Sequence, residues 1–124
     1  MRLLLDTHAL LWWLTESPEL SRRAQAAIRR SAAIYVSAAT AWEIAIQKAH
    51  GKLQAPDDLE DALRANRFEP LSITVAHAWA AGALPRHHDD PFDRLLIAQA
   101  RAESLTLVTR DPWVRRYEVR VLWA

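Results

Sequence analysis

Short apolar runs alternate with longer segments of helical pattern along the chain, without an internal repeat or a low-complexity linker. The apolar runs predict strands over residues 3–5, 34–36, 70–73, 105–109 and 119–123. Because helices separate successive strands, the connections are crossovers, and crossovers join parallel strands. We therefore predict a three-layer α/β/α fold whose mainly parallel sheet has about four to five strands.

Capping residues indicate where the helices between these strands begin. Ser17, followed by Pro18 and Glu19, predicts a helix that starts there and runs to about Arg30. The same kinds of signal predict helices over residues 37–49, 56–66 and 74–82, one starting at 90, and a short one starting at 111. Gly51 is expected to end the helix over residues 37–49.

Length and composition agree with an ordinary globular protein. The chain has 124 residues, of which 51% are hydrophobic and 25% charged, so we expect residues 1–124 to form a single domain. This composition excludes a disordered chain, a collagen-like repeat and a small disulfide scaffold. The absence of cysteine also excludes disulfides, thiol catalysis and thiolate metal sites.

The charge balance and the apolar runs limit the partners that the chain can have. The formal net charge is +1, so any nucleic-acid binding must come from local basic patches. The longest apolar run, residues 9–14, is far shorter than the ~20 residues that a membrane span needs. We expect a cytoplasmic protein without a membrane partner.

Carboxylates stand at the ends of several predicted strands. Asp6 follows the first strand, Glu43 lies two turns into the helix after the second, and Asp111 follows the fourth. Asp93 lies in the first turn of the helix that begins at Asp90. Parallel sheets bind their ligands at the carboxyl ends of the strands, so we expect these four acids on one side of the sheet.

Four clustered carboxylates repel one another unless a cation lies among them. Oxygen donors without cysteine favour magnesium, or manganese, over zinc. Each acid also has a simpler interpretation: Asp111 and Asp90 are suitable N-caps, and Asp93 suits the positive end of a helix. Asp6 and Glu43 are harder to explain in that way, because one ends an apolar strand and the other borders an apolar helix face.

Four stretches of the chain resemble a known family in their order and spacing. They are LLLDTHALLWW, VSAATAWEIAIQKAHGKL, HHDDPFDRLLIAQA and LTLVTRD. They are similar to the PIN-domain ribonucleases, and specifically to the VapC-type toxins of bacterial toxin–antitoxin pairs. The resemblance implies that Asp6, Glu43, Asp93 and Asp111 form the catalytic acidic site, with Asp6 and Asp93 as principal metal ligands and Thr109 as a supporting hydroxyl. Asp93 matches in preference to Asp90 because it keeps the register of the apolar positions that follow.

The resemblance also implies an activity and partners. The expected protein is a magnesium-dependent endoribonuclease that uses water as the nucleophile on an RNA phosphodiester, is inhibited by a cognate antitoxin, and forms a homodimer. Two alternatives stay open. One is a metal-dependent DNA nuclease or phosphodiesterase, because metal-assisted hydrolysis does not by itself distinguish ribose from deoxyribose. The other is a binding module without catalysis.

Several further side chains have both a functional and a structural interpretation. Candidates for contact with substrate phosphate are Arg86, His88, Arg94 and Arg110. His8 and His77 are interpreted as packed or internally bonded histidines. The arginines at 22, 23, 29 and 30 form either a solvated helix face or a track for phosphates. Trp12 and Trp13 diverge by about 100° on one helix, so one of them is expected to meet a partner surface.

Overall fold

A five-stranded parallel sheet forms the centre of the molecule, with the strand order β3-β2-β1-β4-β5. The computed structural model describes residues 1–51 and 53–124. The strands are β1 (Arg2–Leu5), β2 (Ala33–Ser37), β3 (Glu69–Leu71), β4 (Thr106–Thr109) and β5 (Val121–Trp123). The predicted parallel α/β architecture is therefore confirmed.

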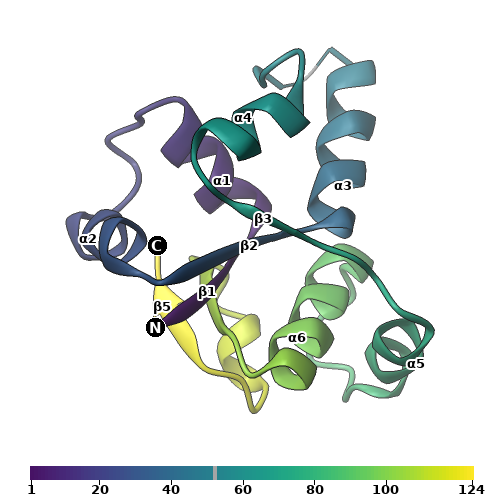
Figure 1. Cartoon of the computed structure of the whole chain (residues 1–124). Coiled ribbons are helices and arrows are strands. Elements are labelled where there is room, and N and C mark those ends of the chain that lie inside the picture. Colours follow the sequence, from purple (N-terminus) through teal and green to yellow (C-terminus); the bar gives the residue numbers. More distant parts are fainter. Residues whose placement is uncertain (52) are drawn as a thin grey trace.

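Helices cover both faces of the sheet (Figure 1). They are α1 (Thr7–Leu14), α2 (Arg22–Arg30), α3 (Ala38–Ala49), α4 (Leu59–Ala65), α5 (Val75–Ala83), α6 (Pro91–Glu103) and the 3-10 helix η1 (Val114–Arg116). Helices α1, α2 and α4 lie on one face, and α5 and α6 lie on the other (Figure 1). No helix in the described part of the chain is long and apolar enough to cross a membrane.

The central strand β1 contributes to two hydrophobic cores. Leu3 and Leu5 pack against α1 and α2, whereas Leu4 points to the opposite face and packs against α6. All three side chains are fully buried. A strand that is buried on both faces must be apolar at every position, which explains the uninterrupted leucine run. The first polar residue after this run, Asp6, therefore lies at the carboxyl edge of the sheet.

The helix expected from Ser17 begins four residues later, so that prediction is wrong. Helix α2 starts at Arg22 and is capped by Ser21, whose hydroxyl accepts from the N–H of Ala24 at 3.1 Å. The Ser17 hydroxyl instead accepts from the N–H of Glu19 at 3.1 Å, within a turn. This turn places Leu20 in the core, where only 2% of its surface is exposed.

Other boundaries also differ from the prediction, and the short helix expected to start at residue 111 is instead the 3-10 helix η1, which starts at Val114. Helix α4 begins at Leu59 rather than at residue 56, because the Asp58 carboxylate caps it by accepting from the N–H of Asp61. Strand β3 is Glu69–Leu71 rather than 70–73, and its Pro70 is tolerated because β3 is an edge strand. Strand β5 starts at Val121 rather than at residue 119.

Candidate active site

The four predicted acids line one pocket of about 420 Å³. Asp6 follows β1, Asp111 follows β4, Glu43 comes from α3 and Asp93 from the first turn of α6. Strands β1 and β4 are neighbours, with Leu5 opposite Val108, so the chain segments after both strands lie side by side. The fold thus brings together acids that are up to 105 positions apart in the sequence, between residues 6 and 111.

Three hydrogen bonds hold Asp6 in place. Its backbone N–H donates to the carbonyl of Val108 at 3.0 Å, and its carboxylate caps α1 by accepting from the N–H of Ala9 at 2.8 Å. The Thr109 hydroxyl hydrogen-bonds to the same carboxylate, and it also accepts from the N–H of Asp111 at 3.1 Å. Burial raises the pKa of Asp6 despite these hydrogen bonds. Thr109 therefore fixes the relative positions of two site acids.

Glu43 reaches the pocket from α3 and is oriented by a second hydroxyl. The Thr7 hydroxyl donates a short hydrogen bond to the Glu43 carboxylate, and Thr7 itself is buried. Partial burial raises the pKa of Glu43, the Thr7 hydrogen bond opposes this, and the negative charge of Asp90 adds to it. The sequence analysis did not single out Thr7, although its place directly after Asp6 was the available signal.

Asp93 and Asp111 share a histidine. The Nε2 atom of His88 lies 2.8 Å from Oδ2 of Asp93 and 2.8 Å from Oδ2 of Asp111. Burial and the charge of Asp90 raise the pKa of Asp93 to about 7. Burial alone would raise the pKa of Asp111, but hydrogen bonds from the Trp113 N–H, Asp93 and His88 outweigh it and lower that pKa. The pKa of Asp111 is thus lower than that of Asp93.

Asp90 acts as the N-cap of α6, as predicted. Its Oδ1 accepts from the N–H of Phe92 at 2.8 Å and from the N–H of Asp93 at 3.1 Å. The side chain lies at the wall of the acidic pocket, where its charge raises the pKa of Asp93. The cap fixes the first turn of α6, and that turn carries Asp93.

The guanidinium of Arg94 is bound by the protein's own backbone. It donates to the carbonyls of Ala81, Leu84, Pro85 and His88 at 2.8–3.3 Å. These acceptors belong to the end of α5 and to the loop before α6. We therefore propose that Arg94 positions this loop, in place of the phosphate contact expected from the sequence.

Tyr117 holds the same loop together with Arg94, which donates to its hydroxyl at 3.4 Å. Its hydroxyl donates to the carbonyl of Pro85 at 2.7 Å and accepts from the N–H groups of His87 and His88 at 3.1 and 2.9 Å. The ring is buried. Arg94 and Tyr117 together place His88 against the acids, and neither role had a signal in the local sequence.

The other two arginines predicted to contact phosphate lie in different surroundings. Arg110 lines the acidic pocket and stacks over Trp12 at 4.5 Å, while its guanidinium also pairs with Glu19 at 3.2 Å and bonds to the Ala124 carbonyl at 2.7 Å. It thereby ties the turn before α2 to the C-terminus. Arg86 is exposed on the loop before α6.

The two histidines interpreted as packed have different outcomes. His77 is buried and capped into α5, and its Nδ1 accepts from the N–H of Thr74 at 3.0 Å while its Nε2 lies 3.0 Å from Glu103. That interpretation is confirmed. His8 is exposed and lines the acidic pocket, with its ring 5.7 Å from Trp12, so the packed interpretation is wrong there.

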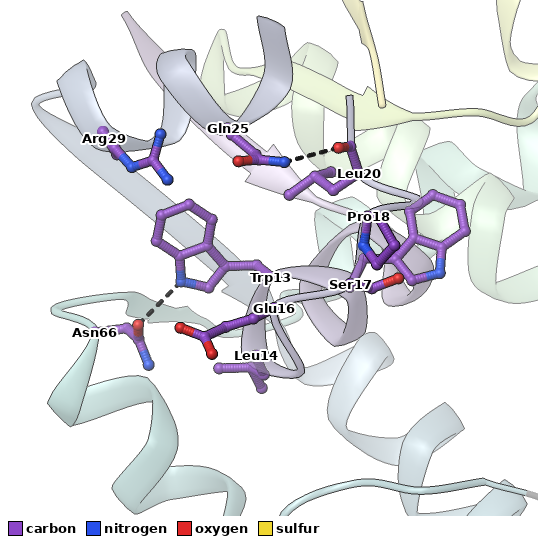
Figure 2. Close-up of a pocket in the computed structure, with 10 residues that line it drawn as sticks. Trp13, Leu14, Glu16, Ser17, Pro18, Leu20, Gln25, Arg29 and Asn66 are labelled. Carbon is purple, nitrogen blue, oxygen red and sulfur yellow. Dashed lines mark hydrogen bonds between the residues drawn. The ribbon is translucent and has the colours of Figure 1, made fainter. Parts of the chain in front are cut away.

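A second pocket, of about 520 Å³, lies beside the end of α1 (Figure 2). The indole N–H of Trp13 donates to Asn66 at 2.9 Å, and the Arg29 guanidinium lies 5.8 Å from the ring (Figure 2). Trp12 lines both this pocket and the acidic one. The two pockets are therefore adjacent at Trp12.

The residues of the acidic pocket fit a divalent cation. Asp6 and Asp93 are largely buried, and burial raises the pKa of both carboxyls. Such carboxylates need a positive charge among them to stay ionised together. Carboxylate oxygens are typical ligands of magnesium or manganese, and the imidazole of His88, which lies with Asp93 and Asp111 at the spacing of metal ligands, suits a first-row transition ion.

Magnesium is expected to raise the melting temperature of the wild-type protein by mass action, and Asp6→Asn to reduce that shift sharply. In metal-free buffer, Asp6→Asn is expected to be neutral or stabilising, because it removes a buried charge from the cluster. Thermal melts with magnesium and with EDTA measure both effects. An unchanged magnesium shift in the variant would remove Asp6 from the site.

Comparison with known proteins identifies the family to which the chain belongs. The PIN-domain family model matches residues 3–119, so the chain belongs to the PIN-domain family, as its motifs predicted. The chain is 32% identical over 117 residues to Ribonuclease VapC22 of Mycobacterium tuberculosis, an alignment that covers 92% of this chain and 90% of that protein.

Solved structures share the fold. VapBC2 from Rickettsia felis, bound to a DNA fragment from its promoter, aligns over 100% of both chains with a TM-score of 0.72 and 18% identity. A toxin–antitoxin complex from Klebsiella pneumoniae aligns over 97% of this chain and 95% of that one, with a TM-score of 0.68 and 20% identity. FitAcB from Neisseria gonorrhoeae gives a TM-score of 0.67 at 22% identity over 98% and 96% of the two chains.

Proposed function

We propose that this PIN-domain protein is a divalent-metal-dependent endoribonuclease and the toxin of a toxin–antitoxin pair, acting in the cytoplasm. The observation that carries the proposal is the convergence of Asp6, Glu43, Asp93 and Asp111 on one pocket at the carboxyl edge of the sheet. The similarity to Ribonuclease VapC22 supports RNA as the substrate.

Each side chain of the pocket has a distinct role in the proposed hydrolysis. Asp6 and Asp93 would hold the ion, magnesium or manganese, with Glu43 and Asp111 binding it directly or through water. When bound, such an ion activates water and neutralises the phosphate. Thr109 and Thr7 keep Asp6 and Glu43 oriented, so little reorganisation accompanies the reaction. The water oxygen forms a bond to phosphorus as the bond from phosphorus to the leaving sugar oxygen breaks.

Arg110 and Arg86 are the basic side chains proposed to contact substrate phosphate. Arg110 lies in the pocket wall, and Arg86 is exposed on the loop before α6. Their charges offset the negative field that the four acids would otherwise present to RNA. The exposed arginines of α2 fit both interpretations: a solvated helix face, or a row of contacts to the phosphates of a bound RNA.

The cognate antitoxin is proposed to block the acidic pocket with a basic side chain. An arginine can pair with two carboxylate oxygens at once and so compete with a hydrated ion. Because Trp12 joins the acidic pocket to the pocket lined by Trp13, one extended segment can place its arginine in the first and apolar side chains in the second. Such a segment would be flexible when free and ordered when bound.

We also propose a homodimer. Helix α5 contains no Asp, Glu, Lys or Arg, and it leaves Val75 and Trp79 more than four-fifths exposed, at 84% and 83%. An uncharged apolar face can pair with its own copy without bringing like charges together. Light scattering of the wild type and Trp79→Lys checks this: we expect a dimer mass that the variant halves.

Growth arrest on expression of this chain alone tests the toxin proposal. We expect wild-type expression to stop growth, Asp6→Asn to abolish the arrest, and co-expression of the protein encoded beside it to relieve the arrest. The antitoxin acts by covering the site, whereas Asp6→Asn removes a ligand. A wild-type chain that is well expressed, folded and harmless would overturn the toxin proposal.

A further inference from the structure

One nitrogen atom lies within the acidic cluster. Nε2 of His88 is 2.8 Å from an oxygen of Asp93 and 2.8 Å from an oxygen of Asp111, and potential ligand atoms of all three side chains lie within 4.8 Å of one another. When an ion lies about 2.1 Å from each of its ligand atoms, two neighbouring ligand atoms are about 3 Å apart. The 2.8 Å contacts of His88 therefore match the spacing of ligands that share one ion.

The position of the ring is built into the fold. The backbone of His88 is held by its N–H to the Tyr117 hydroxyl at 2.9 Å and by its carbonyl to Arg94 at 3.3 Å. The side chain is mostly buried, with 15% of its surface exposed. On the far side of the ring, Nδ1 is 3.5 Å from the Asp90 N–H, too long a contact to fix which nitrogen carries the proton. Nε2 is thus the ring nitrogen that faces the two carboxylates.

We propose that His88 is a nitrogen ligand of the metal site and that it shifts the preference of the site from magnesium toward manganese. This inference rests on the proposed metal-dependent function and adds a ligand to its four acids. Magnesium binds oxygen almost exclusively, whereas first-row transition ions also accept imidazole. Manganese additionally suits carboxylates, which are the other donors present.

The geometry favours His88 over the other histidine of the pocket. His8 is exposed, and its ring packs near Trp12. His87, although adjacent to His88, stacks edge-on against the Tyr117 ring at 5.1 Å. His88 is thus the histidine whose nitrogen reaches two site acids, and His8 and His87 serve as matched controls.

Pulsed electron paramagnetic resonance of manganese bound to the purified full chain tests the proposal. Electron spin echo modulation from a directly coordinated imidazole nitrogen is expected for the wild type, His8→Ala and His87→Ala, and is expected to disappear in His88→Ala. Bound manganese without nitrogen modulation in the wild type would overturn the proposal while leaving the carboxylate site intact. No manganese binding at all would overturn the proposal, and the absence of magnesium binding as well would overturn the metal-dependent function.

Titration calorimetry gives a second readout that is independent of activity. His88→Ala is expected to weaken manganese binding about tenfold and magnesium binding less than about twofold, since only manganese gains from the nitrogen. His88→Asn keeps a polar side chain if the alanine variant fails to fold. Equal losses for both ions would contradict a nitrogen ligand, because a purely structural role would weaken the two ions alike.

Discussion

Asp93→Asn is expected to reduce RNA cleavage by about three orders of magnitude, because it removes the charge of a metal ligand while keeping the shape of the side chain. The carboxylate lies beside His88 and faces the same pocket as Asp6. Its neighbour in the same motif provides the matched control. Asp90→Asn keeps the oxygen that caps α6, so we expect cleavage within about threefold of wild type.

Rates from a fluorogenic RNA at saturating metal measure this pair of variants. The variants also separate two alignments of the motif, because Asp90 and Asp93 both line the pocket. If Asp90→Asn proves inactive and Asp93→Asn active, the assignment of the metal ligand to Asp93 is wrong. Thermal melts of both proteins exclude unfolding as the cause.

Arg94→Met is expected to lower stability by about 3 kcal/mol, which corresponds to a fall of about 10 °C in melting temperature. Methionine keeps the apolar stem but leaves the carbonyls of Ala81, Leu84 and Pro85 without their charged donor. The loop that carries His88 should loosen, so cleavage should fall as well.

Arg86→Met is the control on the same loop. Arg86 is exposed, so its replacement should leave the melting temperature unchanged and raise KM if it contacts substrate phosphate. An Arg94→Met variant with wild-type stability and a raised KM would contradict the positioning role and restore the phosphate contact expected from the sequence.

The acids could be found from the sequence because strand ends are local features. A three-leucine strand followed by Asp6, and an apolar run followed by Asp111, can both be identified without knowledge of the fold. Asp93 was separated from Asp90 by the resemblance to the family motif, whose register with the following apolar positions is also a local feature. The sheet order then brings these positions together, since β1 and β4 pair directly.

The start of α2 could not be predicted because tertiary contacts decide between two serines. Ser17 has the better local signal, with Pro18 next to it. Ser21 is selected instead because its N–H donates to the carbonyl of Ala124 at 3.0 Å, a contact with the C-terminus of the chain. In this placement Leu20 is buried.

The surroundings of His88 could not be predicted either, because they also depend on tertiary contacts. Tyr117 lies 29 residues away, and the histidine's contact to Asp111 spans 23 residues. The sequence placed His88 near phosphate, on a loop whose path it could not define. Of the two hydroxyls that orient the acids, Thr109 could be predicted because it lies in a stretch that resembles the family. Thr7 was not predicted and is identified by its hydrogen bond to Glu43 in the structure.

Incubation of the purified chain with single-stranded RNA and DNA of one sequence tests the central claim, that the four acids form a metal-dependent ribonuclease site. With magnesium or manganese we expect the RNA to be cut and the DNA to stay intact, and we expect EDTA to stop the reaction. Asp6→Asn prepared in parallel excludes a contaminating nuclease. RNA cleavage that persists in EDTA or in Asp6→Asn, or cleavage of DNA alone, would contradict the claim.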